Sequence, residues 1–225
     1  MKLKSLLLST LLLASSFSLQ AINVGAVTVI MEPESKLLSK EIENTNDVAR
    51  FVSVSVSRIS SPMAEGVVIP MESKSELLST PASLILPGNT KENFRFIYNG
   101  PDDNKERYYR LSWTDDPITE FGSNTKKKVG EATTSAIINT ILVVAPRNEK
   151  FDFSRKNDTV YNNGNASFRV VSFGPCKDKN KDSAEGCRER YYVMPGMSAR
   201  IKHTDLSNKK TRIGIWHGEQ YINVN

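Results

Sequence analysis

Short stretches in which apolar and polar residues alternate recur along most of the chain. Residues 51–57 (FVSVSVS) alternate with period two from Val52 onward, residues 94–98 (FRFIY) alternate at their start, and residues 109–113 (YRLSW) alternate throughout. Successive side chains of a β-strand point to opposite faces, so this period indicates strands with one buried face. Further apolar, β-branched stretches lie at residues 137–145, 166–173, 190–194, 198–201 and 212–216.

Residues that favour turns separate these stretches. Pro fixes φ near −65°, and Gly and Asn accept a positive φ. The turn signals stand at Ser61-Pro62, Asn99-Gly100-Pro101, Asn163-Gly164, Gly174-Pro175 and Pro195-Gly196. No long stretch keeps a helical period. Many short strands separated by turns predict an all-β sandwich or barrel.

The strand-like stretches fall into two sets with a boundary at Pro146 and Arg147. The first set, over residues 22–146, has the size of one immunoglobulin-like sandwich. The second set lies in residues 147–225 and contains both cysteines. We therefore expect two domains with these bounds.

The first 21 residues are expected to be a signal peptide. Lys2 and Lys4 give a positive start, an apolar run follows over residues 6–17, and Ala21 is a small residue suited to cleavage. The run is too short for a membrane anchor, which needs about 20 apolar residues. No later segment is apolar enough to span a bilayer, so we expect an exported protein without stable membrane insertion.

The only two cysteines, Cys176 and Cys187, enclose a polar insertion. An exported protein folds in an oxidising compartment, where such a pair usually forms a disulfide. The bridge would clamp the neck of a loop. Two cysteines alone do not make the usual four-ligand structural zinc site.

Charge and composition exclude several classes of function. The formal net charge of +5 includes the two lysines of the expected signal peptide. Without them, the remaining excess of basic residues is too small to indicate binding to nucleic acid. The one dense basic run, residues 126–128, stands among polar residues and is expected to be a solvated loop. Hydrophobic residues are 39% and charged residues 24%, which is typical of a globular protein with a real core.

The usual catalytic constellations are missing from the sequence. His203 and His217 do not have a metal-ligand spacing, and no nucleophile elbow or phosphate-binding loop occurs. The adjacent carboxylates Asp102-Asp103 and Asp115-Asp116 would point to opposite faces of a strand. A catalytic pair of carboxylates that are far apart in the sequence, as in a glycosidase, is still an alternative. The sequence favours a binding protein without metal or cofactor.

Residues 121–145 form an unusual stretch for a binding protein. A polar, small-residue segment leads directly into the apolar run 137–145, so the whole is longer than a typical strand. One interpretation is an ordinary core strand after a long hairpin loop. The other is a strand that extends beyond its own sandwich and offers an unpaired edge to a partner chain.

Six stretches, in order along nearly the whole chain, resemble the periplasmic chaperones of chaperone–usher pili, specifically those of the enterobacterial common pilus (alternate class). They are residues 58–62 (RISSP), 80–87 (TPASLILP), 105–111 (KERYYRL), 140–147 (TILVVAPR), 174–176 (GPC) and 191–196 (YYVMPG). Their combination with a leader and paired cysteines makes the match specific.

The resemblance implies a fold and a function. Two immunoglobulin-like domains would meet at an angle, like a boomerang, in a periplasmic protein. The last strand of the first domain would complete a pilus subunit, either pilin or tip adhesin, by donor-strand complementation. The complex would pass to an outer-membrane usher without ATP or cofactor. Exposed donor edges can also cap one another in a homodimer.

The resemblance also implies which residues contact the subunit. Counting back from Pro146, we expect Thr134, Ala136, Ile138 and Thr140 to face the subunit. Ile137 and Ile141 have the other parity, and a slip of one residue would exchange the two sets.

The family's two basic residues for the subunit's terminal carboxylate fall at Thr28 and Ile141, neither of which is basic. The candidates for this anchor are then Arg110 and Arg147, with surface charges as the alternative. Asp115 matches a family acidic position and could pair with Arg147 as an interdomain salt bridge.

Two other functions compete with the chaperone interpretation. An exported pilin or adhesin-like structural protein would use the same export route, but should be a single incomplete domain with a donor extension. A hydrolase on a sandwich fold would need the catalytic site that the sequence lacks.

Overall fold

The computed structural model describes residues 21–118, 135–178, 186–218 and 220–224. All fifteen regular elements in these ranges are β-strands, which confirms the predicted all-β fold. None of the described residues form a helix long and apolar enough to cross a membrane. The predicted signal peptide up to residue 20, Thr134 and the basic run 126–128 lie outside the described residues.

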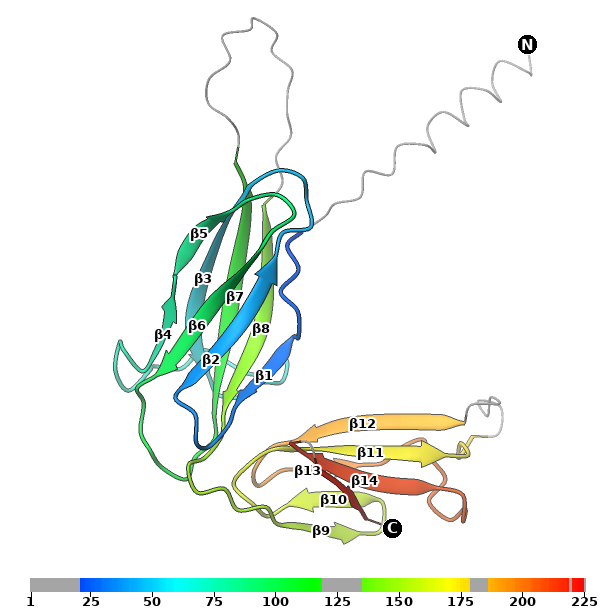
Figure 1. Ribbon diagram of the computed structural model, residues 1–225. Helices are drawn as coiled ribbons and strands as arrows, with labels where there is room; N and C mark the ends of the chain where they lie inside the picture. Colours follow the sequence, from blue (N-terminus) through cyan, green and yellow to red (C-terminus); the bar gives the residue numbers. More distant parts are fainter. Residues whose placement is uncertain (1–20, 119–134, 179–185, 219, 225) are drawn as a thin grey trace, which may run out of the picture.

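The N-terminal half is a sandwich of a five-stranded and a three-stranded sheet (Figure 1). In the larger sheet the order is β1 (Thr28–Met31), β8 (Ala136–Val144), β7 (Arg107–Pro117), β3 (Arg50–Ile59) and β5 (Ser83–Leu86). In the smaller it is β2 (Leu37–Glu43), β6 (Lys91–Tyr98) and β4 (Leu77–Thr80). Neighbours are antiparallel except β1 and β8, which are parallel.

The alternating residues seen in the sequence make the core of this sandwich. Trp113 of β7 is fully buried and meets Phe94 and Phe96 of β6 edge-on, with ring centroids 5.1 and 6.0 Å away. Aromatic pairs prefer this edge-to-face arrangement. The contact joins the two sheets at their centre, so it fixes which face of β7 points inward.

The C-terminal half is a second sandwich with its own buried core. One sheet has the order β13 (Ser198–Arg200), β10 (Thr159–Asn162) and β9 (Phe153–Lys156). The other has the order β12 (Cys187–Val193), β11 (Phe168–Gly174), β14 (Arg212–His217) and β15 (Gln220–Asn223). Val160, Val170 and Ile215 are fully buried between the sheets.

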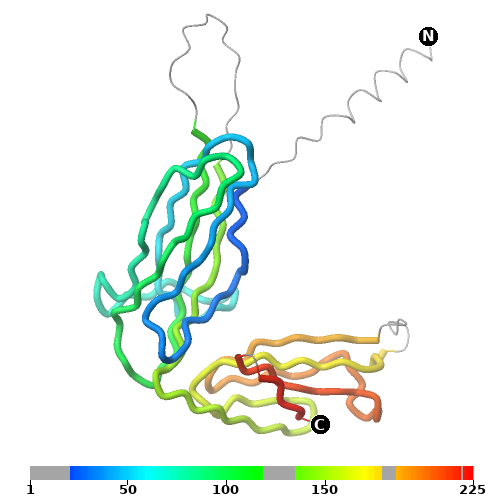
Figure 2. Tube along the Cα trace, in the orientation of Figure 1, coloured from blue at the N-terminus to red at the C-terminus, as the bar shows by residue number. Residues whose placement is uncertain are grey.

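The two sandwiches meet at an angle, as the chain trace shows (Figure 2). The chain leaves β8 in the first sandwich and enters β9 in the second through the segment that contains Pro146 and Arg147. The two-sandwich boomerang therefore agrees with the expectation. The exact domain bounds stay a prediction.

Candidate functional site

The C-terminal half of β8 is enclosed on both sides. Residues 141–144 pair with β7 on one side and with β1 on the other, in the register Thr28 to Ile141 and Met31 to Val144. The backbone N–H of Ile141 donates to the carbonyl of Val27 at 2.8 Å. This half of the strand has no room for a further strand.

The N-terminal half of β8 has only one neighbour. Residues 136–140 pair with residues 111–115 of β7, and no described residue pairs with their other side. This five-residue segment, the open half of β8, lies above the start of β1 in Figure 1. A strand edge with unused backbone donors and acceptors is a template for a partner chain.

The path of the first segment explains why this edge is open. Asn23 pairs with Glu43 of β2, in the opposite sheet, through backbone hydrogen bonds of 2.8 and 2.9 Å. At Gly25 the chain takes φ +63°, a conformation that glycine adopts without steric cost. The Asn23 side chain accepts a 2.9 Å bond from the Gly25 N–H. The chain therefore crosses between sheets here and reaches β8 only at Ile141.

The two faces of β8 differ in burial. Thr140 has an exposed fraction of 0% and its hydroxyl accepts a 2.9 Å hydrogen bond from the indole N–H of Trp113. Ile138 packs against the same core. Ile137 is 69% exposed, and Asn139 is exposed as well. The even-numbered residues thus face the protein's own core, and the odd-numbered ones face outward.

This burial corrects the expected subunit-facing set. Ile138 and Thr140 point into the sandwich, so they cannot enter a partner, and Ala136 shares their parity. Thr134 is not among the described residues. Trp113 on the neighbouring strand β7 determines which residues of β8 face inward, because its indole N–H donates to the Thr140 hydroxyl. The outward set is Ile137, Asn139 and Ile141, the alternative parity of the sequence analysis.

Arg110 stands on the outward face beside this set. It pairs in register with Ile141 of β8 and Ser57 of β3, and its guanidinium makes only a long 3.4 Å contact with the carbonyl of Gly66. Within the described part of the chain no carboxylate lies at ion-pair distance. Arg110 is therefore available to a carboxylate carried by a partner.

Arg147 is held by the protein itself. Its guanidinium donates to the carbonyls of Glu32, Pro33 and Ser35, at 3.2, 2.7 and 2.7 Å. It also lies 3.4 Å from Asp102 and 5.1 Å from the ring centre of Tyr98. These contacts fix the turn between β1 and β2. Of the two anchor candidates, Arg110 is the one without a carboxylate partner among the described residues.

Asp115 does not pair with Arg147, contrary to the expectation of an interdomain salt bridge. Its buried carboxylate accepts from Nε of Arg50 at 2.6 Å and from the backbone N–H of Ile22 at 3.1 Å. Asp115 lies next to Ala136 in the register, at the end of the sandwich where β8 begins. It therefore tethers the segment before β1, at Ile22, to the sheet, and Arg147 makes contacts of its own.

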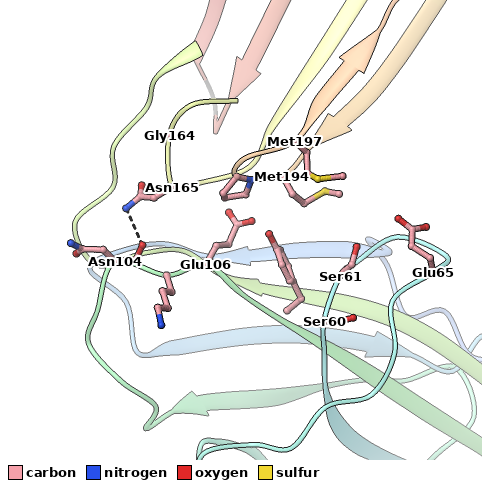
Figure 3. Close-up of a pocket in the computed structure, with 12 residues that line it drawn as sticks. Ser60, Ser61, Glu65, Asn104, Glu106, Gly164, Asn165, Met194 and Met197 are labelled. Carbon is pink, nitrogen blue, oxygen red and sulfur yellow. Dashed lines mark hydrogen bonds between the residues drawn. The ribbon is translucent and has the colours of Figure 1, made fainter. Parts of the chain in front are cut away.

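The two sandwiches are joined by residues for which no role was predicted. Glu106 accepts from the backbone N–H and the hydroxyl of Ser167, at 2.7 and 3.1 Å. Burial is the main cause that raises the pKa of Glu106. Asn165 donates to the carbonyl of Asn104 at 3.1 Å (Figure 3). These bonds join the segment before β7 to the loop before β11.

A cavity of about 540 Å³ lies beside these junction contacts (Figure 3). Tyr108 and Met194 both line it, and both belong to a small apolar cluster with Ile59, Val143 and Ile141. The lining includes Lys105 together with the acids Glu65 and Glu106. With one cation and two acids in its described lining, the cavity is not a favourable site for a carboxylate.

The predicted disulfide between Cys176 and Cys187 is present, with a Cα–Cα separation of 5.0 Å. It joins the loop after β11 to the start of β12, so it clamps the neck of the polar insertion as expected. Within the described ranges no group of three or more His, Cys, Asp or Glu side chains is placed to hold a metal ion.

The family model and the relatives that match this chain carry the same family name. Residues 151–224 match the family of the EcpB C-terminal domain. The probable fimbrial chaperone EcpB of Klebsiella pneumoniae (strain 342) is 43% identical over 98% of this chain and 99% of its own. The protein of that name from Escherichia coli O157:H7 is 42% identical with the same coverage.

Solved structures share the fold. The class 5 fimbriae chaperone CfaA has a TM-score of 0.56 at 17% identity, with 90% of this chain and 97% of that chain covered. A chain in the complex of the Salmonella enterica SafA pilin with the SafB chaperone has a TM-score of 0.53 at 17% identity, covering 89% and 91%. At this identity, the likeness supports the two-domain fold.

Proposed function

Since the chain belongs to the EcpB family of fimbrial chaperones, we propose that it holds pilus subunits by lending them the open half of β8. The observation that carries this proposal is the unpaired edge of residues 136–140, with Ile137 exposed beside it. The subunit, a pilin or tip adhesin, would be incomplete and would receive this segment as its missing strand.

The backbone of the open half is ready for this pairing. The N–H groups of Ile141 and Ala145 donate to Val27 and Met31 on the β1 side. Backbone groups alternate in direction along a strand, so those of Asn139 and Ile137 point to the same side. A subunit strand beside β8 would continue the ladder that β1 begins. Its hydrogen bonds would supply affinity for any subunit with a vacant strand position.

Outward side chains would supply the apolar contact. Burying a fully exposed isoleucine contributes about 1.5–3 kcal/mol, and Ile137 is the most exposed large apolar residue in the described chain. Asn139 lies between Ile137 and Ile141 and offers a polar side chain. The outward set of β8 therefore offers only two apolar side chains, Ile137 and Ile141. A subunit groove with one or two deep apolar pockets would fit them.

Arg110 would bind the terminal carboxylate of the subunit. It shares the outward face with Ile141 and has no carboxylate partner among the described residues. Its guanidinium can form two parallel hydrogen bonds with a carboxylate. We place the complex in the periplasm and infer that it is handed to an outer-membrane usher, where another subunit's strand replaces β8.

The test compares two isoleucines at opposite edges of one sheet. Ile137 on β8 is 69% exposed and Ile85 on β5 is 61% exposed. A tagged chaperone is co-expressed in the periplasm with a pilin of its own pilus, and the co-purified pilin is measured. Ile137→Asp should reduce recovery to background, because a charge would enter an apolar groove. Ile85→Asp should leave recovery unchanged.

Circular dichroism shows whether each variant is folded. A folded Ile137→Asp protein that recovers pilin at the wild-type level would overturn the proposal. Equal loss with Ile85→Asp would also contradict it, since capture would then not depend on the β8 edge.

A further inference from the structure

The outer face of the four-stranded sheet β12-β11-β14-β15 carries a set of arginines and aromatic rings. Inward positions of these strands, such as Val170 and Ile215, build the core, so the alternate positions face outward. This Arg-aromatic face consists of Arg169, Phe173, Arg188, Arg190, Tyr192, Arg212, Trp216 and Tyr221, with Val171, Gly214 and Asn223 at the remaining outward positions. None of these outward strand positions is acidic.

Strand register arranges the face in rows. Arg169 lies between Tyr192 and Trp216, and Phe173 lies between Arg188 and Arg212. The ring of Tyr221 lies against Gly214, where a Cβ would be 2.3 Å from it. A glycine at this position lets the ring lie flat on the sheet. The result is a groove of about 340 Å³ lined by all four arginines, Phe173, Trp216 and Tyr221.

The guanidinium groups are positioned by the rings beneath them. Arg169 lies 5.9 Å from the ring centre of Trp216, and Arg188 lies 5.6 Å from that of Phe173. A stacked guanidinium keeps its N–H edge free while losing little further side-chain freedom on binding. The Nε of Arg169 is buried and has no hydrogen-bond acceptor in the described chain.

The charge of the face is not neutralised within the described residues. Among the described residues none of the four arginines has an ion-pair partner, and Arg212 donates only to the carbonyls of Lys209 and Thr211. By contrast, Arg200 on the other sheet pairs with Asp158 at 2.7 Å. Four unpaired guanidinium groups around one groove favour an anionic ligand.

We propose that the Arg-aromatic face binds an extended, acidic segment of a protein partner. Arg188 and Arg190 stand two residues apart on β12, which corresponds to roughly 7 Å. Carboxylates at alternate positions of an extended chain have the same spacing. Each arginine would bind one carboxylate through two parallel hydrogen bonds. This site lies in the C-terminal sandwich and does not involve the β8 edge.

A membrane surface fits the face less well. Insertion into a lipid interface needs apolar side chains that are free to leave water. Here guanidinium groups lie over Phe173 and Trp216, and Val171 is the only aliphatic side chain on the face. The outermost layer is therefore charged, which favours a partner with carboxylates over the hydrocarbon of a bilayer.

The test uses the full mature chain and an eight-residue peptide of alternating Glu and Thr, with a Gln-Thr peptide as its control. Isothermal calorimetry and NMR shifts of the Trp216 indole report binding. We expect the Glu peptide to bind, the Gln peptide not to bind, and the affinity to fall as salt rises. Arg190→Gln should weaken binding about tenfold, because a charge-assisted pair is lost.

Matched variants separate specific from general charge effects. Arg95→Gln removes an exposed arginine from a sheet of the other sandwich and should leave the affinity unchanged. Arg190→Lys should restore only part of it, because lysine cannot form the two parallel bonds.

Absence of Glu-peptide binding, or equal loss in Arg190→Gln and Arg95→Gln, would overturn the proposal. Arg190-dependent binding to phosphatidylglycerol vesicles without peptide binding would also overturn it, in favour of a lipid. Arg190→Gln should capture pilin normally, so failure here leaves the role of β8 untouched.

Discussion

The two halves of β8 belong to one strand and pair with the same neighbour, β7, but they have different surroundings. Residues 141–144 are covered by β1, and their side chains lie in the core or in the small apolar cluster that contains Tyr108 and Met194. Residues 136–140 have a bare edge and an outward isoleucine. The difference arises outside β8, because the first segment pairs with the opposite sheet before it reaches Ile141.

The other end of the same sheet shows how an edge is usually protected. β5 is only four residues long and stands between Pro81 and Pro87, two features that discourage pairing with another chain. The open half of β8 contains neither proline nor lysine. The β5 edge of the sheet is thus protected against pairing, whereas the open half of β8 is not. An unprotected edge is expected of a strand that pairs with a partner chain.

The largest effect on stability should come from the enclosed half of β8. Leu142 is fully buried in the core. Leu142→Ala should lower the free energy of unfolding by about 2–5 kcal/mol, because it leaves a cavity. Urea denaturation followed by tryptophan fluorescence measures the change. A midpoint equal to that of the wild type would mean that β8 is not a core strand at Leu142.

Reducing the Cys176–Cys187 disulfide should have the next largest effect, and it should be confined to the second sandwich. We expect a loss of about 2–4 kcal/mol, since the bridge closes a loop in the unfolded chain. Guanidinium unfolding of the oxidised and reduced proteins gives the value. Pilin capture by folded, reduced protein should persist. Loss of capture without unfolding would show that the subunit also depends on this loop.

Thr140→Val tests the parity of the open half. The change removes the buried acceptor of the Trp113 indole N–H and should cost about 1–3 kcal/mol. Thr114→Val, on the outward face of β7, should change the stability by no more than about 0.5 kcal/mol. Thermal unfolding compares them. If Thr140→Val keeps full stability but loses pilin capture, the inward assignment of Thr140 is wrong.

Ile137→Ala should have the smallest effect on folding. Ile137 is exposed, so the free energy of unfolding should change by no more than about 0.5 kcal/mol. The complex with pilin should nevertheless dissociate faster, because the variant buries less apolar surface. Surface plasmon resonance gives the dissociation rate. An unchanged rate with an unchanged stability would remove Ile137 from the contact.

The sequence was sufficient for the all-β class, the two sandwiches, the disulfide and the strands with a clear local pattern, whereas the strands β2, β4, β5, β9, β10 and β15 lack such a pattern and were not predicted. Period-two alternation marks residues 51–57 as a strand with one buried face, and β3 covers them. The parity of β8 has no such signal. Residues 141–144 are apolar at every position, so the phase depends on contacts across the sheet, such as that of Thr140 with Trp113.

The partners of the charged residues could not be predicted from the sequence either, because they are distant from them along the chain. Asp115 and Arg50 are 65 residues apart, and only the β3–β7 register brings them together. Arg147 binds carbonyls of the turn after β1, and carbonyl groups give no signal in a sequence. Glu106 was part of a resembling stretch, but its bond to Ser167 depends on how the two sandwiches meet.

Amide hydrogen exchange of the free chaperone and of its pilin complex tests the role of β8 most directly. The amide of Ile141 bonds to Val27 and should be protected in both. The amides of Ile137 and Asn139 point to the open edge, so they should exchange fast in the free protein and become protected in the complex. If they are already protected in the free chaperone, or still exchange fast in the complex, β8 does not lend its edge to the subunit.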